Sequence, residues 1–358
     1  MLDKYLAQTP YSLPVSERRA MMLEDLNALT QHHVATCEPY RKILDGLWGG
    51  QTNAACFEEV PYLPVSLFKT HKLQSVADDA VRATLTSSGT TGAVVSQIYV
   101  DSDTSRNQQL GLTNSLGHIL GKKRLPMLVL DTDATFRNPK YMNARGAGVL
   151  GMMRFGRDHH FALRPNLDLA LDVVETFLDK HGNGPFFMFG FTFLVWASFF
   201  QALKGQDLDL ANGVLIHSGG WKKMEEKAVD NVVFRASFKE NFQLEKIYNF
   251  YGMVEQLGSI FLEGRDGLLY PPNFSDVIIR DPDTFAPAPT GTAGIIQVLS
   301  LLPGSYPGHS LITEDIGVIE AVDAGHGGWN GNGLRVIGRV PKAELRGCSD
   351  VFSQKLSM

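Results

Sequence analysis

Cysteine is scarce in this chain of 358 residues. Its three cysteines, Cys37, Cys56 and Cys348, are an odd number, are widely spaced and include no C-x-x-C pair. This pattern excludes a disulfide framework and a cysteine-based structural zinc site, and it favours a reducing compartment such as the cytoplasm. We predict that Cys37 and Cys56 are buried as small apolar side chains.

Neither sign of charge prevails. The 33 lysines and arginines face 38 aspartates and glutamates, which gives a formal net charge of −5. This balance provides no electrostatic footprint for nucleic acid or for an anionic membrane. The first ten residues contain an early acid and no apolar core of signal-peptide length, so we do not expect export.

A long membrane-spanning run is also missing. Residues 186–202 carry no charge, but Gly190 interrupts them and they include Thr192, Ser198 and Gln201. Because a spanning helix needs ~20 mostly apolar residues, we predict a buried strand followed by a core helix, and no stable membrane insertion. The same segment is compatible with the wall of an apolar substrate pocket.

Apolar strand patterns alternate with helical patterns along most of the chain. Residues 16–47 have helical spacing with a break at Pro39, and the two prolines within residues 59–73 favour an extended segment. Strands are predicted at residues 127–130, 186–189, 214–216, 246–250, 277–279, 295–299 and 318–321. This alternation predicts an α/β fold of mixed sheets covered by helices. The Pro- and Gly-rich residues 286–294 are predicted to join subdomains.

One loop combines four hydroxyl side chains and two glycines between two predicted strands. Glycine permits backbone geometries that point successive N–H groups inward, and hydroxyls add donors, so the loop suits an anion such as phosphate. It has no lysine of the Walker type, and taken alone such a cluster is more often a surface turn. The loop consists of Ser87, Ser88, Gly89, Thr90, Thr91 and Gly92.

Two further motifs follow predicted strands. In Y-N-F-Y-G-M-V-E-Q, Tyr251 offers a flat ring suited to adenine and Glu255 a carboxylate suited to Mg²⁺, although an ordinary strand end explains them equally well. In I-H-S-G-G-W-K-K, Gly219 and Gly220 allow close approach to the backbone. The two lysines that follow could reach a phosphate or simply begin a solvated helix.

The last pair of motifs is T-E-D-I-G and V-I-G-R. Asp315 at a strand end could accept both hydroxyls of a ribose, and Arg339 could hold a hydroxyl or phosphate with its planar fork. Alone, Asp315 is typical of a turn.

In this order the motifs resemble those of the adenylate-forming superfamily, and most closely those of the acyl-protein synthetase (LuxE-type) family. The resemblance rests on S-S-G-T-T-G, H-S-G-G-W-K-K, Y-G-M-V-E-Q, T-E-D-I-G and R-G-C. It implies the large N-terminal-type α/β domain of these enzymes, with the C-terminal lid domain missing or vestigial. We therefore expect a single acyl-adenylating domain over residues 1–358, with a lead-in (1–75), an α/β core (76–340) and a short tail (341–358).

The resemblance also implies roles for individual residues. The loop Ser87 to Gly92 would bind the phosphates of ATP, Glu255 would hold Mg²⁺ and act in catalysis, and Asp315 with Arg339 would hold the ribose. Val254 departs from the Tyr-Gly-x-Thr-Glu pattern of the superfamily and removes one hydroxyl contact to the adenylate. The remaining nucleotide-binding positions implied are Gly219, Gly220, Tyr251 and Gly252.

A cysteine near the C-terminus accepts the acyl group in LuxE-type proteins, and Cys348 is the candidate here. Arg346 nearby would favour its nucleophilic thiolate, but a spare thiol explains Cys348 equally well. In the adenylate-forming superfamily the lid domain supplies a catalytic lysine, and the sequence does not choose which residue takes its place here. Its candidates are Lys69, Lys222, Lys223 and Lys342.

These observations predict an ATP-dependent, AMP-forming ligase with ATP and Mg²⁺ as cofactors. It would activate a carboxylic acid, fatty or otherwise apolar, as an acyl-adenylate and then pass the acyl group to a protein thiol. Its partners would be the acid and an acyl-accepting reductase, acyltransferase or carrier protein. Two alternatives stay open: transfer to coenzyme A or a carrier protein, and a non-catalytic nucleotide-binding subunit of an acyl-transfer complex.

Overall fold

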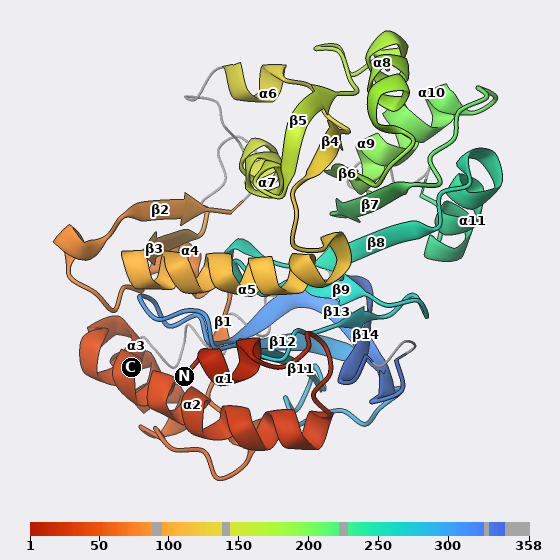
Figure 1. Ribbon diagram of the computed structural model, residues 1–358. Helices are drawn as coiled ribbons and strands as arrows, with labels where there is room; N and C mark the ends of the chain where they lie inside the picture. Colours follow the sequence, from red (N-terminus) through yellow and green to blue (C-terminus); the bar gives the residue numbers. More distant parts are fainter. Residues whose placement is uncertain (88–94, 138–143, 222–227, 326–328, 341–358) are drawn as a thin grey trace. The chain divides into compact units, whose positions relative to one another are not determined.

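The computed structural model describes residues 1–87, 95–137, 144–221, 228–325 and 329–340 (Figure 1). The chain divides into two compact units. Unit 1 comprises Met1–Ser115 and Gly252–Met358, and unit 2 comprises Leu116–Tyr251. The predicted fold class, mixed sheets covered by helices, is confirmed, while the predicted division into lead-in, core and tail stays a prediction.

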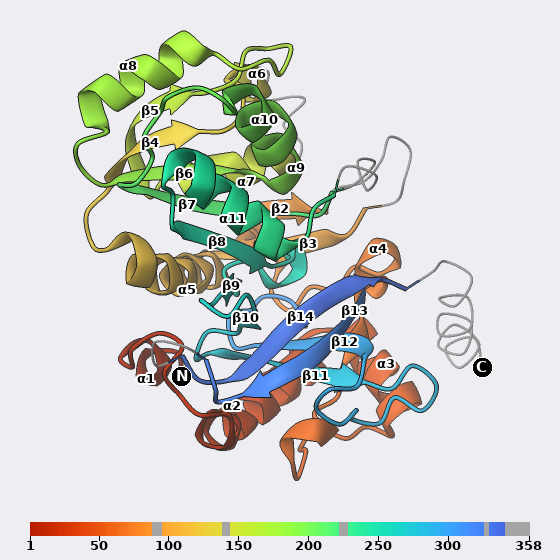
Figure 2. The same cartoon turned by 90° about the vertical axis from the view of Figure 1, so that its right-hand side faces the viewer.

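Unit 2 contains a parallel sheet with the strand order β5-β4-β6-β7-β8. Figures 1 and 2 show α7 on one face of this sheet and α8 and α11 on the other. Coverage of both faces explains why the strands at residues 125–129, 186–191 and 213–218 read as apolar runs. The strands are β4 (Leu125–Val129), β5 (Gly156–Phe161), β6 (Phe186–Phe191), β7 (Gly213–Ser218) and β8 (Lys246–Tyr251), and the helices include α6 (Ala134–Arg137), α7 (Ala144–Met153), α8 (Leu171–His181) and α11 (Asn231–Phe242).

The uncharged stretch of residues 186–202 forms β6 and the helical segment after it. That segment runs through α9 (Thr192–Leu194), a π-helical turn (Val195–Phe200) and α10 (Gln201–Leu203). Trp196 stacks on Phe200 with ring centroids 4.5 Å apart, inside the core of unit 2. The prediction of a buried strand and a core helix is confirmed. Among the described residues, no helix is both long enough and apolar enough to cross a membrane.

Unit 1 contains an antiparallel sheet with the strand order β11-β12-β13-β14-β10-β9, and β1 pairs with β13 in parallel. Residues 286–294 connect β11 to its direct neighbour β12. The prediction that they join subdomains is wrong, because their prolines and glycines build a connection within one sheet. The strands are β1 (Leu63–Pro64), β9 (Phe261–Glu263), β10 (Leu269–Tyr270), β11 (Ser275–Arg280), β12 (Gly294–Ser300), β13 (Ser310–Val322) and β14 (Asn332–Arg339).

Two N-terminal helices pack on this sheet. Helix α2 (Val15–Thr36) buries Leu26 in one cluster with Leu299 of β12. Cys37 has extended backbone (φ −123°), and Pro39 lies in the first turn of α3 (Glu38–Trp48), so the predicted break at the proline is confirmed. Within residues 59–73, the predicted extended segment contains β1 but also the short helix α4. The remaining helices of unit 1 include α1 (Asp3–Leu6), α4 (Leu67–Thr70), η1 (Phe57–Glu59), η2 (Asp78–Ala80) and η6 (Val254–Gln256), and α5 (Ser102–Leu120) runs across the boundary into unit 2.

A buried ion pair joins α2 to the sheet of unit 1. Arg18 and Asp276 are both 0% exposed, and Arg18 Nη2 lies 3.1 Å from Asp276 Oδ1. The other carboxylate oxygen accepts a bond from Arg19 Nε at 2.9 Å, and Asn332 Nδ2 donates to Oδ1 at 2.9 Å. Burial alone would raise the pKa of Asp276, but the two guanidinium groups outweigh it and hold that pKa below its ordinary value. Strand β11, strand β14 and helix α2 therefore share one carboxylate.

A second buried polar cluster lies between α2 and the segment before β13. His309 Nε2 is 2.9 Å from Thr30 Oγ1, and His33 Nδ1 is 2.8 Å from Ser75 Oγ. The two imidazoles stack with centroids 5.1 Å apart. Burial lowers the pKa of His309 to about 3 and that of His33 well below its usual value. Both rings are therefore neutral at pH 7, which avoids burying two adjacent positive charges.

This cluster should make the stability of the protein sensitive to acid. The unfolded chain binds protons on these histidines once the pH falls below about 6.5, whereas folded His309 resists protonation until about pH 3. The free energy of unfolding should therefore decrease as the pH is lowered through that window. His309 alone should account for a decrease of about 2 kcal/mol between pH 7 and pH 5. Urea unfolding of His309→Gln at both pH values should show a pH dependence smaller by this amount, and the partly exposed His71→Gln should match the wild type. An unchanged pH dependence in His309→Gln would contradict the expectation.

Candidate active site

The base of the predicted phosphate loop is a closed hairpin in unit 1. Strand β2 (Ala83–Thr86) pairs antiparallel with β3 (Gln97–Val100). Beyond the last pair, Ser87 N–H donates to Ser96 O at 3.3 Å, and Ser96 N–H donates to Ser87 Oγ at 3.0 Å. The prediction of a turn between two strands is thus confirmed at its base. Its other members, Ser88, Gly89, Thr90, Thr91 and Gly92, lie outside the described residues.

Glu255 lies in unit 1 on η6 and is buried, with 5% of its surface exposed. Burial raises its pKa, the nearby Ser96 hydroxyl and Lys69 ammonium lower it, and Glu314 raises it further. Lys69 Nζ itself lies 3.3 Å from Glu314 Oε1. The predicted metal ligand therefore lies beside Ser96 at the hairpin base and within the electrostatic influence of Lys69. Of the four lysines considered for catalysis, Lys69 is the one within the described residues.

Asp315 and Arg339 meet across two strands of unit 1. They are register partners on β13 and β14, and Arg339 Nε lies 3.3 Å from Asp315 Oδ1. The pairing register shifts immediately afterwards, between Ile316 and Gly317, which is the irregularity of a β-bulge. The Arg339 side chain is 78% exposed, whereas that of Asp315 is 17% exposed. The sequence predicted both residues for one ligand, and the structure brings them together.

Thr313 holds the backbone of this motif in place, a part that the sequence reading did not assign. Its buried hydroxyl donates to Ile296 O at 2.9 Å, and the Asp315 N–H donates to the same hydroxyl at 3.1 Å. Its position in T-E-D-I-G, two residues before the aspartate, is the signal that could have revealed this role.

The predicted glycines and Tyr251 lie at the carboxyl ends of neighbouring strands in unit 2. Gly219 and Gly220 directly follow β7, Tyr251 ends β8, and the two strands pair in parallel up to Ser218 and Phe250. The carboxyl ends of parallel strands are where open α/β sheets bind ligands. Gly252, the next residue along the chain, begins the second segment of unit 1.

His217 is a buried histidine in this motif to which the sequence reading gave no role. Its Nδ1 lies 3.0 Å from Thr192 Oγ1, and its ring lies 4.6 Å from that of Phe234. Burial, with a contribution from the charge of Arg235, lowers its pKa to about 3. At neutral pH this imidazole is therefore uncharged, two residues before Gly219.

The cysteine predictions have mixed outcomes. Cys37 is buried as predicted, and burial raises the pKa of its thiol. Cys56 is exposed, so the prediction of burial is wrong there: its neighbours Ala54 and Phe57 enter the core of unit 1, and the side chain of Cys56 between them lies at the surface. Cys348, Lys222, Lys223 and Lys342 lie outside the described residues.

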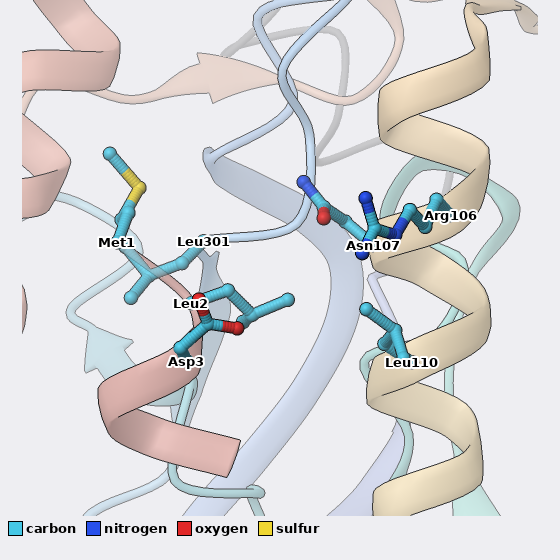
Figure 3. Close-up of a pocket in the computed structure, with 7 residues that line it drawn as sticks. All are labelled: Met1, Leu2, Asp3, Arg106, Asn107, Leu110 and Leu301. Carbon is cyan, nitrogen blue, oxygen red and sulfur yellow. The ribbon is translucent and has the colours of Figure 1, made fainter. Parts of the chain in front are cut away.

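A shallow pocket of about 270 Å³ lies elsewhere in unit 1 (Figure 3). Residues at the start of the chain form one side, and Arg106, Asn107 and Leu110 of α5 form the other. None of its lining residues is a predicted site residue, so it adds nothing to the candidate active site.

Comparison with known proteins decides the family. The model of the family described as "Acyl-protein synthetase, LuxE" matches residues 1–357. The chain belongs to this family. Membership confirms the resemblance seen in the motifs and the predicted enzyme class, because a LuxE-family acyl-protein synthetase is a ligase.

Two LuxE-family relatives are long-chain-fatty-acid–luciferin-component ligases. The protein of Vibrio harveyi is 23% identical in an alignment of 361 positions that covers 98% of this chain and 92% of the relative. The protein of Aliivibrio fischeri is 24% identical in an alignment of 306 positions that covers 83% of this chain and 79% of the relative.

Solved structures show the same fold. An open conformation of 2-hydroxyisobutyryl-CoA ligase in complex with 2-HIB-AMP and CoA has a TM-score of 0.67 at 16% identity, over 92% of this chain and 76% of that one. The same ligase in its postadenylation state also has a TM-score of 0.67, over 92% and 69% of the two chains. Because the identity is only 16%, these similarities show the fold of the LuxE-family chain and do not show which ligands it binds.

The glycine pair after β7 offers a matched test of the local backbone. Gly219 has φ +84°, and an added Cβ would lie 3.3 Å from Phe191, whereas Gly220 has open space around it. Gly219→Ala should therefore lower the free energy of unfolding by about 1 kcal/mol, and Gly220→Ala should change it little. Chemical denaturation of both variants measures the difference. Equal stabilities would show that the left-handed backbone at Gly219 is not required.

Proposed function

We propose that this LuxE-family chain uses MgATP to activate a long-chain fatty acid as the acyl-adenylate and then transfers the acyl group to a thiol. A carboxylate oxygen attacks the α-phosphate of ATP, an acyl–O–P bond forms, and pyrophosphate leaves. The thiolate then attacks the acyl carbon, a thioester forms, and AMP leaves with the electron pair of the broken C–O bond. The proposal depends above all on one observation, the buried Glu255 beside the hairpin base of Ser87 and Ser96.

The surroundings of Glu255 suit a divalent cation. A buried carboxylate is costly in isolation, and burial raises the pKa of this one. Mg²⁺ prefers carboxylate oxygens and phosphate oxygens together, and the predicted phosphate loop begins at the hairpin beside Glu255. Bound Mg²⁺ would supply positive charge to the phosphates of ATP. Lys69, which lies near Glu255, is our candidate for stabilising the charge on the transferring phosphoryl group.

Asp315 and Arg339 suit the ribose. A carboxylate can accept hydrogen bonds from two neighbouring hydroxyls, and a guanidinium has five N–H donors in a fixed plane. Arg339 Nε faces Asp315 Oδ1, so the pair is already oriented, and its exposed fork can reach a ligand. We assign Tyr251, Gly219, Gly220 and Gly252 to the adenine and the rest of the nucleotide.

The apolar acid is supported by two observations. The relatives in Vibrio harveyi and Aliivibrio fischeri act, by their names, on long-chain fatty acids. In unit 2, the partly buried Phe191 at the end of β6 lies beside Gly219. We propose that the acyl chain lies against the ring of Phe191.

Glu255→Gln tests the metal assignment. Loss of the negative charge should reduce acid-dependent ATP–pyrophosphate exchange by about 100-fold or more, because a neutral amide binds Mg²⁺ far more weakly than a carboxylate. The control is Glu320→Gln on β13, whose exposed carboxylate pairs with Arg335; it should exchange as the wild type does. Full exchange in Glu255→Gln would reject this residue as the metal ligand. Absence of exchange in the wild type across a panel of fatty and other acids would favour the non-catalytic nucleotide-binding alternative.

Cys348→Ser tests the acyl acceptor. With radiolabelled fatty acid and ATP, the wild type should carry a label on the polypeptide that neutral hydroxylamine removes, because hydroxylamine cleaves thioesters. Cys348→Ser should lose that label while retaining ATP–pyrophosphate exchange, and Cys56→Ser, which removes an exposed thiol, should keep it. Labelling that survives in Cys348→Ser would reject Cys348. Transfer to added coenzyme A without any labelled polypeptide would favour the alternative acceptor.

A further inference from the structure

Three potential metal ligands gather at the edge strand of unit 2, and none of them is a residue assigned to the reaction. Asp158 and His160 lie on β5, and His181 lies in the last turn of α8. One ligand atom from each lies within 4.8 Å of the others. His181 Nε2 is 2.7 Å from Asp158 Oδ2, and His160 Nε2 is 3.6 Å from Asp158 Oδ1.

The backbone at Asp158 is irregular in a way that serves this cluster. Asp158 has φ +49°, a left-handed conformation that is uncommon outside glycine. The register between β4 and β5 shifts at this residue: Pro126 pairs with Arg157, and Met127 pairs with His159. Asp158 is thus the extra residue of a β-bulge, and bulges re-aim side chains. The residue with this left-handed backbone is therefore the one whose carboxylate lies beside both imidazoles.

The ring of Phe177 contacts the rings of both histidines. This ring, buried in the core of unit 2, lies 5.4 Å from the ring of His160 and 5.2 Å from that of His181. The two imidazoles lie nearly perpendicular, with centroids 6.4 Å apart. Contact with the ring of Phe177 restricts the orientation of both imidazoles and leaves their ring nitrogens available.

We propose that Asp158, His160 and His181 form a binding site for a divalent transition-metal ion of the Zn²⁺ type, with water as the fourth ligand. Two imidazole nitrogens and one carboxylate oxygen are a ligand set that Zn²⁺ accepts in tetrahedral geometry. With metal–ligand bonds of about 2 Å, such ligand atoms lie ~3.3 Å apart. The observed separations, 2.7 Å from His181 Nε2 to Asp158 Oδ2 and 3.6 Å from His160 Nε2 to Asp158 Oδ1, involve different oxygens of one carboxylate and lie on either side of that value.

Lys180 is the cation that the metal must displace. Its Nζ lies 2.7 Å from Asp158 Oδ2, and its side chain is 58% exposed, so it can move into solvent without losing buried contacts. Lys180 and His181 already favour the ionised carboxylate and hold the pKa of Asp158 far below its ordinary range. The bound ion would link the edge strand β5 to α8.

Calorimetric titration of the metal-free full chain with ZnCl₂ tests the proposal. We expect one site, with at least ~10-fold weaker binding in His160→Asn and in His181→Asn. His159→Asn is the matched control, because His159 is the next residue on β5 but directs its Nε2 to Met153 O at 2.9 Å; its affinity should equal that of the wild type. Co²⁺ in place of Zn²⁺ should give the visible absorption of a tetrahedral complex in the wild type and in His159→Asn, but not in His160→Asn or His181→Asn.

The variant Lys180→Gln distinguishes a loss of metal ligands from a loss of the folded structure. Removing the competing positive charge should tighten Zn²⁺ binding by about threefold or more, an effect that damage to the fold would not produce. Two outcomes would overturn the proposal: no Zn²⁺ binding by the wild type, or equal affinity in the wild type and the His160→Asn/His181→Asn double variant with native circular dichroism.

Discussion

The carboxylate of Asp276 is the interaction on which unit 1 depends. It accepts bonds from the buried Arg18 and the partly exposed Arg19 of α2 and from the buried Asn332 at the start of β14. Removing one partner of a buried ion pair typically costs about 3–5 kcal/mol, since the other charge stays buried. The buried Arg18 side chain also leaves no room for a side chain at Gly331, where an added Cβ would lie 2.6 Å from an Arg18 nitrogen. The N-terminal helices and the C-terminal strands therefore fold as one body.

The candidate active site inherits its geometry from these elements. Strand β14 begins at Asn332 beside the buried carboxylate and ends at Arg339, the register partner of Asp315 on β13. In unit 2 the corresponding constraint is the parallel sheet, which places the residues after β7 and β8 at one edge. In both units rigid strands carry the polar residues at their ends, as is general for ligand sites on folded scaffolds.

Much of the fold could be predicted because strong apolar runs with polar ends have few alternatives, as residues 186–189 and 214–216 illustrate. The order of the motifs indicated the family, and the match of the family model to residues 1–357 confirms it. Long-range partners could not be predicted. The pairing of Lys69 with Glu314 and the position of Ser96 beside Glu255 depend on tertiary packing that leaves no local pattern. Cys56 shows the same limit, because the apolar character of a small side chain does not determine its burial.

The bulge at Asp158 has a consequence for solubility as well. Strand β5 ends the described sheet of unit 2, and a regular edge strand offers open N–H and C=O groups to any other strand, including one from a second copy of the chain. An extra residue in left-handed backbone breaks that ladder, and the flanking charges of Asp158 and Lys180 would have to be desolvated by an approaching strand. The same irregularity that gathers three ligand atoms therefore guards the sheet against edge-to-edge aggregation.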